Sequence, residues 1–194
     1  MRAAVRPGRT YAAFAALGPR PDDARVAGAK ALSTLLFVGA FVSFTSCGRL
    51  VAAHLLWTIV FWSFVPLVQL GALALVLRAL ARDRSLAFAA RLYFAGHGPW
   101  IVFMLALAGV CIFSTDVYAA MMRLLVTGIL PGALVATFAW GGVLTWATFR
   151  RGLGLARGRA TAATSIYYAA FIGSIVLYYF VTDQIRPQFF GVPS

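Results

Sequence analysis

Long apolar runs separated by short arginine-rich connections constrain this 194-residue chain more than any other feature. Five runs are long enough to cross a bilayer, at about residues 31–47, 51–77, 92–113, 122–148 and 163–182. A transmembrane helix needs roughly 20 apolar residues, and an isolated strand in lipid would leave its backbone groups unpaired. The sequence therefore predicts an all-α, polytopic bundle of about five transmembrane helices. Pro66 and Pro131 are expected to tilt or kink the two longest.

Composition supports the same class of protein. Hydrophobic residues make up 62% of the chain and charged residues only 11%, whereas soluble domains carry roughly 25% charged residues. A cytosolic enzyme, a disulfide-rich secreted domain and a disordered chain are therefore excluded. The two cysteines, Cys47 and Cys111, are too few for a disulfide framework or a four-ligand zinc site, and we expect both to be free thiols.

The positive charges alternate from one connection to the next. Three clusters hold most of the 17 Lys and Arg residues, and only Arg49, Arg123 and Arg186 lie elsewhere. Because cytoplasmic connections carry the excess of Lys and Arg, this pattern predicts five spans with the N-terminus inside and the C-terminus outside. It divides the chain into a basic tail (1–30), a transmembrane domain (31–186) and a short outer tail (187–194). The clusters are Arg2, Arg6, Arg9, Arg20, Arg25 and Lys30, then Arg78, Arg82, Arg84 and Arg91, then Arg150, Arg151, Arg157 and Arg159.

A net charge of +12 raises the question of a nucleic-acid partner. The basic residues lie between hydrophobic runs without interleaved aromatic residues, so we expect anionic lipid headgroups, not nucleic acid, as their partner. The expected headgroup contacts are Arg78, Arg82, Arg84, Arg91, Arg150, Arg151, Arg157 and Arg159.

The basic N-terminal tail bears on the location of the protein. The first 20 residues contain four Arg and no acidic residue, as in a mitochondrial presequence, but they contain no Ser and are poorly amphipathic. We therefore expect a bacterial inner membrane rather than a mitochondrial one. The apolar run 11–17 within this tail predicts either a short interfacial helix or a tethered segment.

The two histidines are the candidate cofactor ligands. His54 falls near the outer end of the second run and His97 near the inner end of the third, so the two cannot share one iron or zinc ion. Separate axial ligation of a pigment or haem is the weaker alternative for each. We expect interfacial histidines that bond to backbone or headgroups, and we predict no cofactor and no metal.

Few other residues in the runs suggest chemistry. Residues 96–100, Gly-His-Gly-Pro-Trp, are a poor helix interior and predict either the start of the third span or a break within it. Gln69 is the most strongly polar side chain within a run and is expected to join helices together. No carboxylate lies deep within an apolar run, and no Ser or Cys pairs with a His at a common depth. Both observations disfavour a coupled pump and an enzyme.

Two short segments resemble a known family. Arg91-Leu-Tyr-Phe-Ala-Gly-His-Gly-Pro99 opens the third span, and Gly154-Leu-Ala-Arg-Gly-Arg-Ala160 leads into the fifth. With the five-span pattern, they resemble the Yip-type (Ypt/Rab-interacting) membrane proteins and their bacterial relatives. That family's Asp-Leu-Tyr-Gly-Pro and Gly-Tyr-Pro signatures are absent, so no site residue is carried over. The resemblance implies a membrane-organising factor.

Three functions follow as expectations. The first is a non-catalytic accessory subunit of a larger membrane complex, whose partners are lipids and other integral membrane proteins. Its basis is the many aromatic residues and the lack of a catalytic constellation. The second is a transporter or channel for a small solute or lipid, with its site at the breaks near Pro66, His97–Pro99 and Pro131. The third is the Yip-like organising factor.

Overall fold

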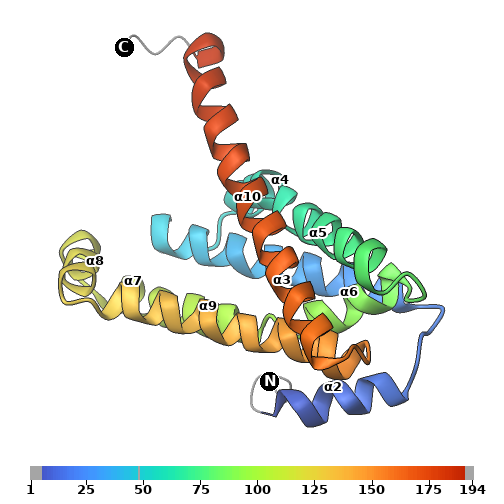
Figure 1. Cartoon of the computed structure of the whole chain (residues 1–194). Coiled ribbons are helices and arrows are strands. Elements are labelled where there is room, and N and C mark those ends of the chain that lie inside the picture. Colours follow the sequence, from blue (N-terminus) through green and yellow to red (C-terminus); the bar gives the residue numbers. More distant parts are fainter. Residues whose placement is uncertain (1–5, 48, 191–194) are drawn as a thin grey trace.

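The computed structural model describes the backbone of residues 6–47 and 49–190, and side chains there apart from 45–47, 179 and 182–190. Every regular element in this part of the chain is helical (Figure 1). Five helical stretches are long and apolar enough to cross a membrane: Asp23–Phe44, Ala52–Leu80, Leu86–Phe113, Ile129–Gly152 and Arg157–Tyr178. The expected all-α chain with five candidate spans is confirmed.

Most spans consist of more than one helix. The described elements are α2 (Pro7–Ala16), α3 (Asp23–Cys47), α4 (Ala52–Trp62), α5 (Phe64–Leu80), α6 (Leu86–Phe94), α7 (Gly98–Phe113), α8 (Val117–Val126), α9 (Ile129–Ala147), the π-helix η1 (Thr148–Gly152) and α10 (Arg157–Phe190).

Three spans begin earlier than the sequence predicts. The first begins at Asp23 instead of residue 31, the third at Leu86 instead of residue 92, and the fifth at Arg157 instead of residue 163. Lys30 and Arg91, which hydropathy places in connections, therefore lie inside spans. Both find partners there: Lys30 Nζ donates to the Arg91 carbonyl oxygen at 3.5 Å, and Arg91 pairs with Asp23.

The prolines of the spans lie near helix starts. Pro99 is in the first turn of α7, and Pro66 follows the junction of α4 and α5 at Ser63. Pro131 is in the first turn of α9. That helix begins directly after Gly128, which has a left-handed φ of 76° and separates α8 from α9. The predicted fourth span, 122–148, was therefore wrong at its start, because α8 is a separate short helix that joins α7 to α9 (Figure 1).

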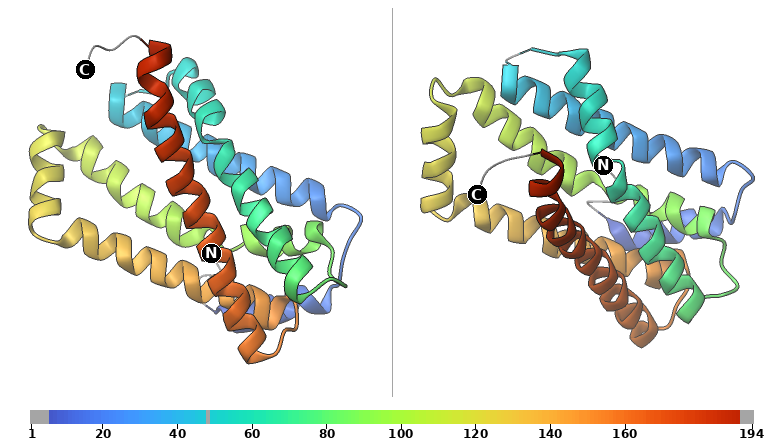
Figure 2. Two further views of the ribbon diagram at one scale, coloured as in Figure 1. Left: turned by 45° about the horizontal axis from the view of Figure 1, so that its top comes forward. Right: turned by 90° about the horizontal axis from the view of Figure 1, so that it is seen from above.

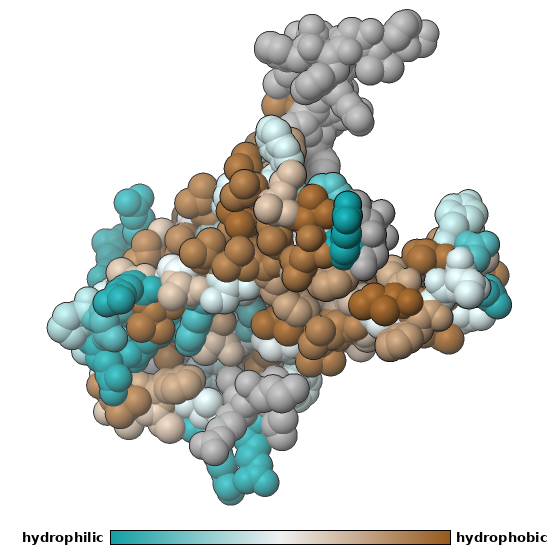
Figure 3. Space-filling view, turned by 180° about the vertical axis from the view of Figure 1, so that it is seen from behind, coloured by the Kyte–Doolittle hydropathy of each residue, from teal (hydrophilic) through white to brown (hydrophobic). Residues whose placement is uncertain are grey.

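The core lies at one end of the bundle, where α5 meets α6 and η1 meets α10 (Figure 2). We call this the arginine-rich end, after Arg78, Arg82, Arg84, Arg150, Arg151, Arg157 and Arg159. Fully buried apolar side chains such as Leu73, Leu92, Phe149 and Tyr167 gather there. By contrast, α7 and α8 contain no buried residue. Seen from behind, hydrophilic residues cover the end near the α5–α6 connection, and apolar residues cover the middle of the molecule (Figure 3).

Helix α2 packs against the arginine-rich end, so residues 7–16 are not a tethered tail. Tyr11 is fully buried, and α2 contacts η1 and α9. The connection to α3 is fixed by an ion pair in which Arg91 Nη1 lies 2.7 Å from Asp23 Oδ1. Arg91 also donates to the Gly18 carbonyl oxygen at 3.1 Å, and the Arg20 backbone N–H donates to Asp23.

Arg91 therefore departs from the expected headgroup contacts. Its side chain is only 11% exposed, because Asp23 compensates its charge within the protein. Arg150 is half-buried and donates to the Leu155 carbonyl oxygen. The remaining six arginines of that set are exposed, and their contact with headgroups stays a prediction.

Candidate binding cavity

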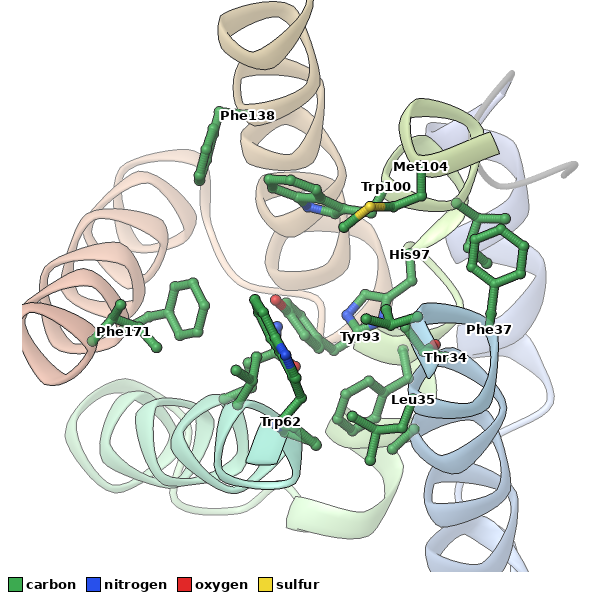
Figure 4. A pocket seen from close by; sticks show the side chains of 18 of the residues that line it. Thr34, Leu35, Phe37, Trp62, Tyr93, His97, Trp100, Met104, Phe138 and Phe171 are labelled. Carbon is green, nitrogen blue, oxygen red and sulfur yellow. The ribbon is translucent and has the colours of Figure 1, made fainter. Parts of the chain in front are cut away.

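A cavity of about 480 Å³ lies between the five spans. Small-molecule sites in proteins are typically concave, mostly apolar and of roughly 300–1,000 Å³. All five spans contribute to its wall, and Figure 4 shows ten of the side chains labelled around it. The wall consists of Ala31, Thr34, Leu35, Phe37, Val38, Trp62, Val65, Pro66, Gln69, Tyr93, Phe94, His97, Trp100, Ile101, Met104, Phe138, Tyr168, Phe171, Ile172 and Ile175.

The cavity lies near the middle of the spans. Thr34, Gln69, His97, Phe138 and Tyr168 each fall in the middle third of their own span, counted along the helix. They come from five different spans and reach one cavity. If the spans cross a bilayer, the cavity is at the depth of the hydrocarbon core, far from either headgroup layer.

The wall is apolar and aromatic, with a few neutral polar groups. None of the 20 wall residues is Asp, Glu, Lys or Arg. Polar atoms come from Gln69, His97, Thr34 and the tyrosine and tryptophan side chains. A charged solute is strongly disfavoured at such a depth without a compensating charge. The wall therefore suits an uncharged, largely apolar molecule.

Helix breaks form part of this wall. His97 is the last residue before α7, and the α6–α7 break spans residues 95–97. Trp62 and Pro66 lie on either side of the α4–α5 junction. Irregular backbone at membrane depth is tolerated where it lines a cavity or is buried in protein, and both breaks fit that rule. Figure 4 shows His97 and Trp62 extending toward the cavity from different walls.

Aromatic contacts fix the residues around the break. The His97 ring makes edge-on contacts with Tyr93 and Phe94, with ring centroids 5.4 Å and 5.0 Å apart. Tyr167 donates its hydroxyl hydrogen bond to Tyr93. Trp100 packs edge-on against Phe138 at 4.8 Å, which joins α7 to α9. Edge-to-face pairs of this kind stabilise a defined geometry beyond simple burial, so these contacts orient the rings of His97 and Trp100 in the wall.

The structure separates the sequence-predicted candidates. His97 lines the cavity and lies 12 residues into its 28-residue span, at the break between α6 and α7, farther from the end of the span than the sequence places it. The reason is that the span begins at Leu86. His54 lies in the first turn of α4 and is not part of the wall. The two histidines therefore do not meet in this cavity, as expected from their separation along the spans.

Other candidates have mixed outcomes. Gln69 is buried and lines the cavity, as does Pro66, whereas Pro131 does not. Sequence reasoning missed Trp62, Trp100, Tyr168 and Phe171, because aromatic residues are common throughout this chain and nothing in their spacing separates residues that line the cavity from residues that face lipid.

Cys111 is a free thiol, and the side chain of Cys47 lies outside the described residues. Within the described ranges, no three His, Cys, Asp or Glu residues come together as metal ligands would.

No protein-family model, curated protein or solved structure matches the chain. The resemblance to Yip-type proteins therefore stays a prediction.

Proposed function

We propose that this chain is a multi-pass membrane protein that binds an uncharged lipophilic small molecule inside its helical bundle. The observation that carries this proposal is the cavity of about 480 Å³ at mid-span, lined by all five spans and free of charged side chains. Among the expected functions, it supports the transport or binding of a membrane-dissolved molecule at broken helices. A purely structural subunit needs packed interfaces, and nothing in that role calls for an internal cavity.

Two features favour a molecule that enters from the bilayer. Large apolar side chains such as Trp57, Phe61 and Leu105 are exposed around the bundle, as expected for helices that face lipid. The cavity wall has the same apolar character as that surface, so a hydrophobic molecule dissolved in the membrane would meet a continuous apolar environment. An ion or a sugar would not.

The proposal is tested by narrowing the cavity. Val38 lines it from α3, while Leu36 on the same helix is 44% exposed and lies outside the wall. Val38→Trp should reduce binding of the apolar probe 2-ethylnaphthalene, and Leu36→Trp should leave it unchanged. Binding is measured as the excess of probe in lipid nanodiscs that contain the protein over empty nanodiscs. Equal probe in both kinds of nanodisc would contradict the proposal. If the wild-type protein also migrates only within a large native complex, the accessory-subunit function is favoured instead.

We infer that the arginine-rich end faces the cytoplasm, with the N-terminus inside and the C-terminus outside. The positive-inside rule supports this orientation, and a bacterial inner membrane remains the expected location. The six exposed arginines Arg78, Arg82, Arg84, Arg151, Arg157 and Arg159 are then placed to contact anionic headgroups. In a variant without native cysteines, Ala12→Cys and Tyr118→Cys should label from opposite sides of sealed vesicles. Labelling from the same side would overturn the orientation.

A further inference from the structure

A second, much smaller cavity adjoins the large one at the α6–α7 break. Its volume is about 20 Å³, and it shares Tyr93, His97, Trp100 and Tyr168 with the wall of the large cavity. A space of this size holds one water molecule or one oxygen-bearing group, since a water needs about 10–15 Å³. Its wall is richer in hydroxyl groups than the large cavity, because Tyr11, Thr145 and Thr148 also line it.

The Tyr11 hydroxyl in this small cavity is buried and has no hydrogen-bond partner among the described residues. Thr148 lies beside it, but the Thr148 hydroxyl donates to the Leu144 carbonyl oxygen at 2.9 Å and makes no hydrogen bond of ordinary geometry with Tyr11. Leaving a buried hydroxyl unpaired costs roughly 1–3 kcal/mol. Such a group at a cavity wall points to a missing partner with an acceptor or donor atom.

The approach of Tyr11 to this site depends on Gly96. A Cβ atom at position 96 would lie 2.6 Å from the Tyr11 hydroxyl oxygen, so a side chain there would collide with it. The glycine of the break thus leaves room for a residue of α2, a helix outside the spans, to reach the cavity region. The hydroxyl lies beside the break, where the two cavities share their walls.

We propose that the small cavity is the polar subsite of the large one and takes a single uncharged oxygen of the bound molecule, with Tyr11 donating the hydrogen bond. The ligand class is an apolar molecule with a carbonyl or hydroxyl oxygen at one end. This inference rests on the proposed binding function. It adds that α2 supplies a ligand-binding residue and that the polar end of the ligand points toward the α6–α7 break.

The chemistry of the wall supports an uncharged oxygen. None of the ten residues around the small cavity is Asp, Glu, Lys or Arg. The Thr145 hydroxyl donates to the Gly141 carbonyl oxygen at 2.9 Å and lies 3.5 Å from the Tyr168 hydroxyl. These two groups are therefore engaged with the protein, and the Tyr93 hydroxyl accepts from Tyr167. Tyr11 is the hydroxyl of this wall that has no hydrogen-bond partner among the described residues.

The test compares two probes of nearly the same shape, 2-acetylnaphthalene and 2-ethylnaphthalene, which differ in one carbonyl oxygen. With the full-length protein in nanodiscs, we expect tighter binding of the ketone after correction for its partition into empty nanodiscs. Tyr11→Phe should weaken ketone binding by about three- to tenfold, the effect of one hydrogen bond, and should leave hydrocarbon binding unchanged. Tyr118→Phe, at a side chain 78% exposed, is the matched control and should change neither.

The outcomes separate the subsite from the binding function itself. If both probes bind the wild type equally and Tyr11→Phe affects neither, the small cavity holds a structural water only and the subsite is overturned, while the binding function stands. If Tyr11→Phe weakens both probes alike, Tyr11 acts through packing, and the subsite is also overturned. Thermal unfolding of Tyr11→Phe shows whether α2 has lost its fold. If neither probe binds the wild type, the proposed function itself fails.

Discussion

The two halves of the third span, α6 and α7, differ sharply although both are apolar helices of one continuous crossing. Six of the nine residues of α6 are buried, whereas α7 has no buried residue among its sixteen. The α6 half packs against α3, α5 and η1 in the core at the arginine-rich end. The α7 half exposes Val102, Leu105 and Ile112. In lipid, hydrophobicity alone does not drive helices together, so the burial of α6 depends on its packing and its polar contacts.

The change occurs at the break around His97, which lies in the cavity wall. One side of this boundary is held by specific ties, including the Asp23–Arg91 ion pair and the buried Tyr11. On the other side, the contact of the Trp100 and Phe138 rings joins α7 to α9, and no residue of α7 is buried. A binding site between a half packed in the core (the rigid half) and a half with no buried residue (the looser half) can admit a molecule on one side and position it on the other.

The largest expected effect is at the ion pair of the rigid half. Arg91→Ala should destabilise the protein by about 3–5 kcal/mol, because it leaves the buried Asp23 carboxylate without its cation. Thermal unfolding in a mild detergent measures the loss. Asp83 and Arg84 form a matched control, since their ion pair is 3.2 Å long but 75% and 44% exposed. Arg84→Ala should therefore change stability little. Equal losses for Arg84→Ala and Arg91→Ala would remove the distinction between a buried tie and a surface pair.

A matched pair of leucines compares the two halves directly. Leu92 in α6 is 1% exposed, and Leu105 in α7 is 53% exposed. Leu92→Ala should cost about 2–5 kcal/mol through the cavity it leaves in the core. Leu105→Ala should change stability by less than about 0.5 kcal/mol, because lipid fills the space. The same unfolding assay measures both. A large loss for Leu105→Ala would mean that another protein surface covers α7, as an accessory subunit requires.

A pair of glycines sharpens the position of the boundary. A Cβ at Gly96 would also lie 3.2 Å from the Tyr93 carbonyl oxygen, in addition to its collision with Tyr11, whereas nothing lies within 4 Å of a Cβ at Gly109 in α7. Gly96→Ala should therefore destabilise the protein by about 1–3 kcal/mol. Gly109→Ala should be neutral or stabilise it by up to about 1 kcal/mol, since Ala favours helix. Adding Tyr11→Phe to Gly96→Ala should restore part of the loss. Destabilisation by both glycine variants alike would place α7 in a packed environment.

Much of the fold could be predicted from hydropathy and charge, and the site could not. The number of spans follows from the long runs of apolar residues. The break at residues 96–100 follows from the poor fit of Gly and Pro in a helix interior. The early starts at Asp23 and Leu86 were missed because a sequence shows the charges of Asp23 and Arg91 but not their pairing. The cavity was missed for a related reason. Its wall joins residues far apart in the chain, and aromatic side chains that line a cavity look the same in sequence as those that face lipid.

The smallest expected effect concerns α2 at alkaline pH. Burial raises the pKa of the Tyr11 hydroxyl above its usual value near 10, and the neighbouring Thr148 opposes this only in part. A pKa that is raised in the folded state favours the neutral form there, so this contribution to stability is complete below about pH 10 and is lost as pH rises through the folded-state pKa. Between pH 9 and pH 11.5, the wild type should therefore lose slightly more thermal stability than Tyr11→Phe, which has no proton to lose. Other tyrosines titrate in the same range and affect both proteins equally, and Tyr118→Phe should follow the wild type because its side chain is exposed. Identical pH profiles for wild type and Tyr11→Phe would show that Tyr11 is not buried in the membrane-bound protein, and α2 would then belong to the looser part of the molecule.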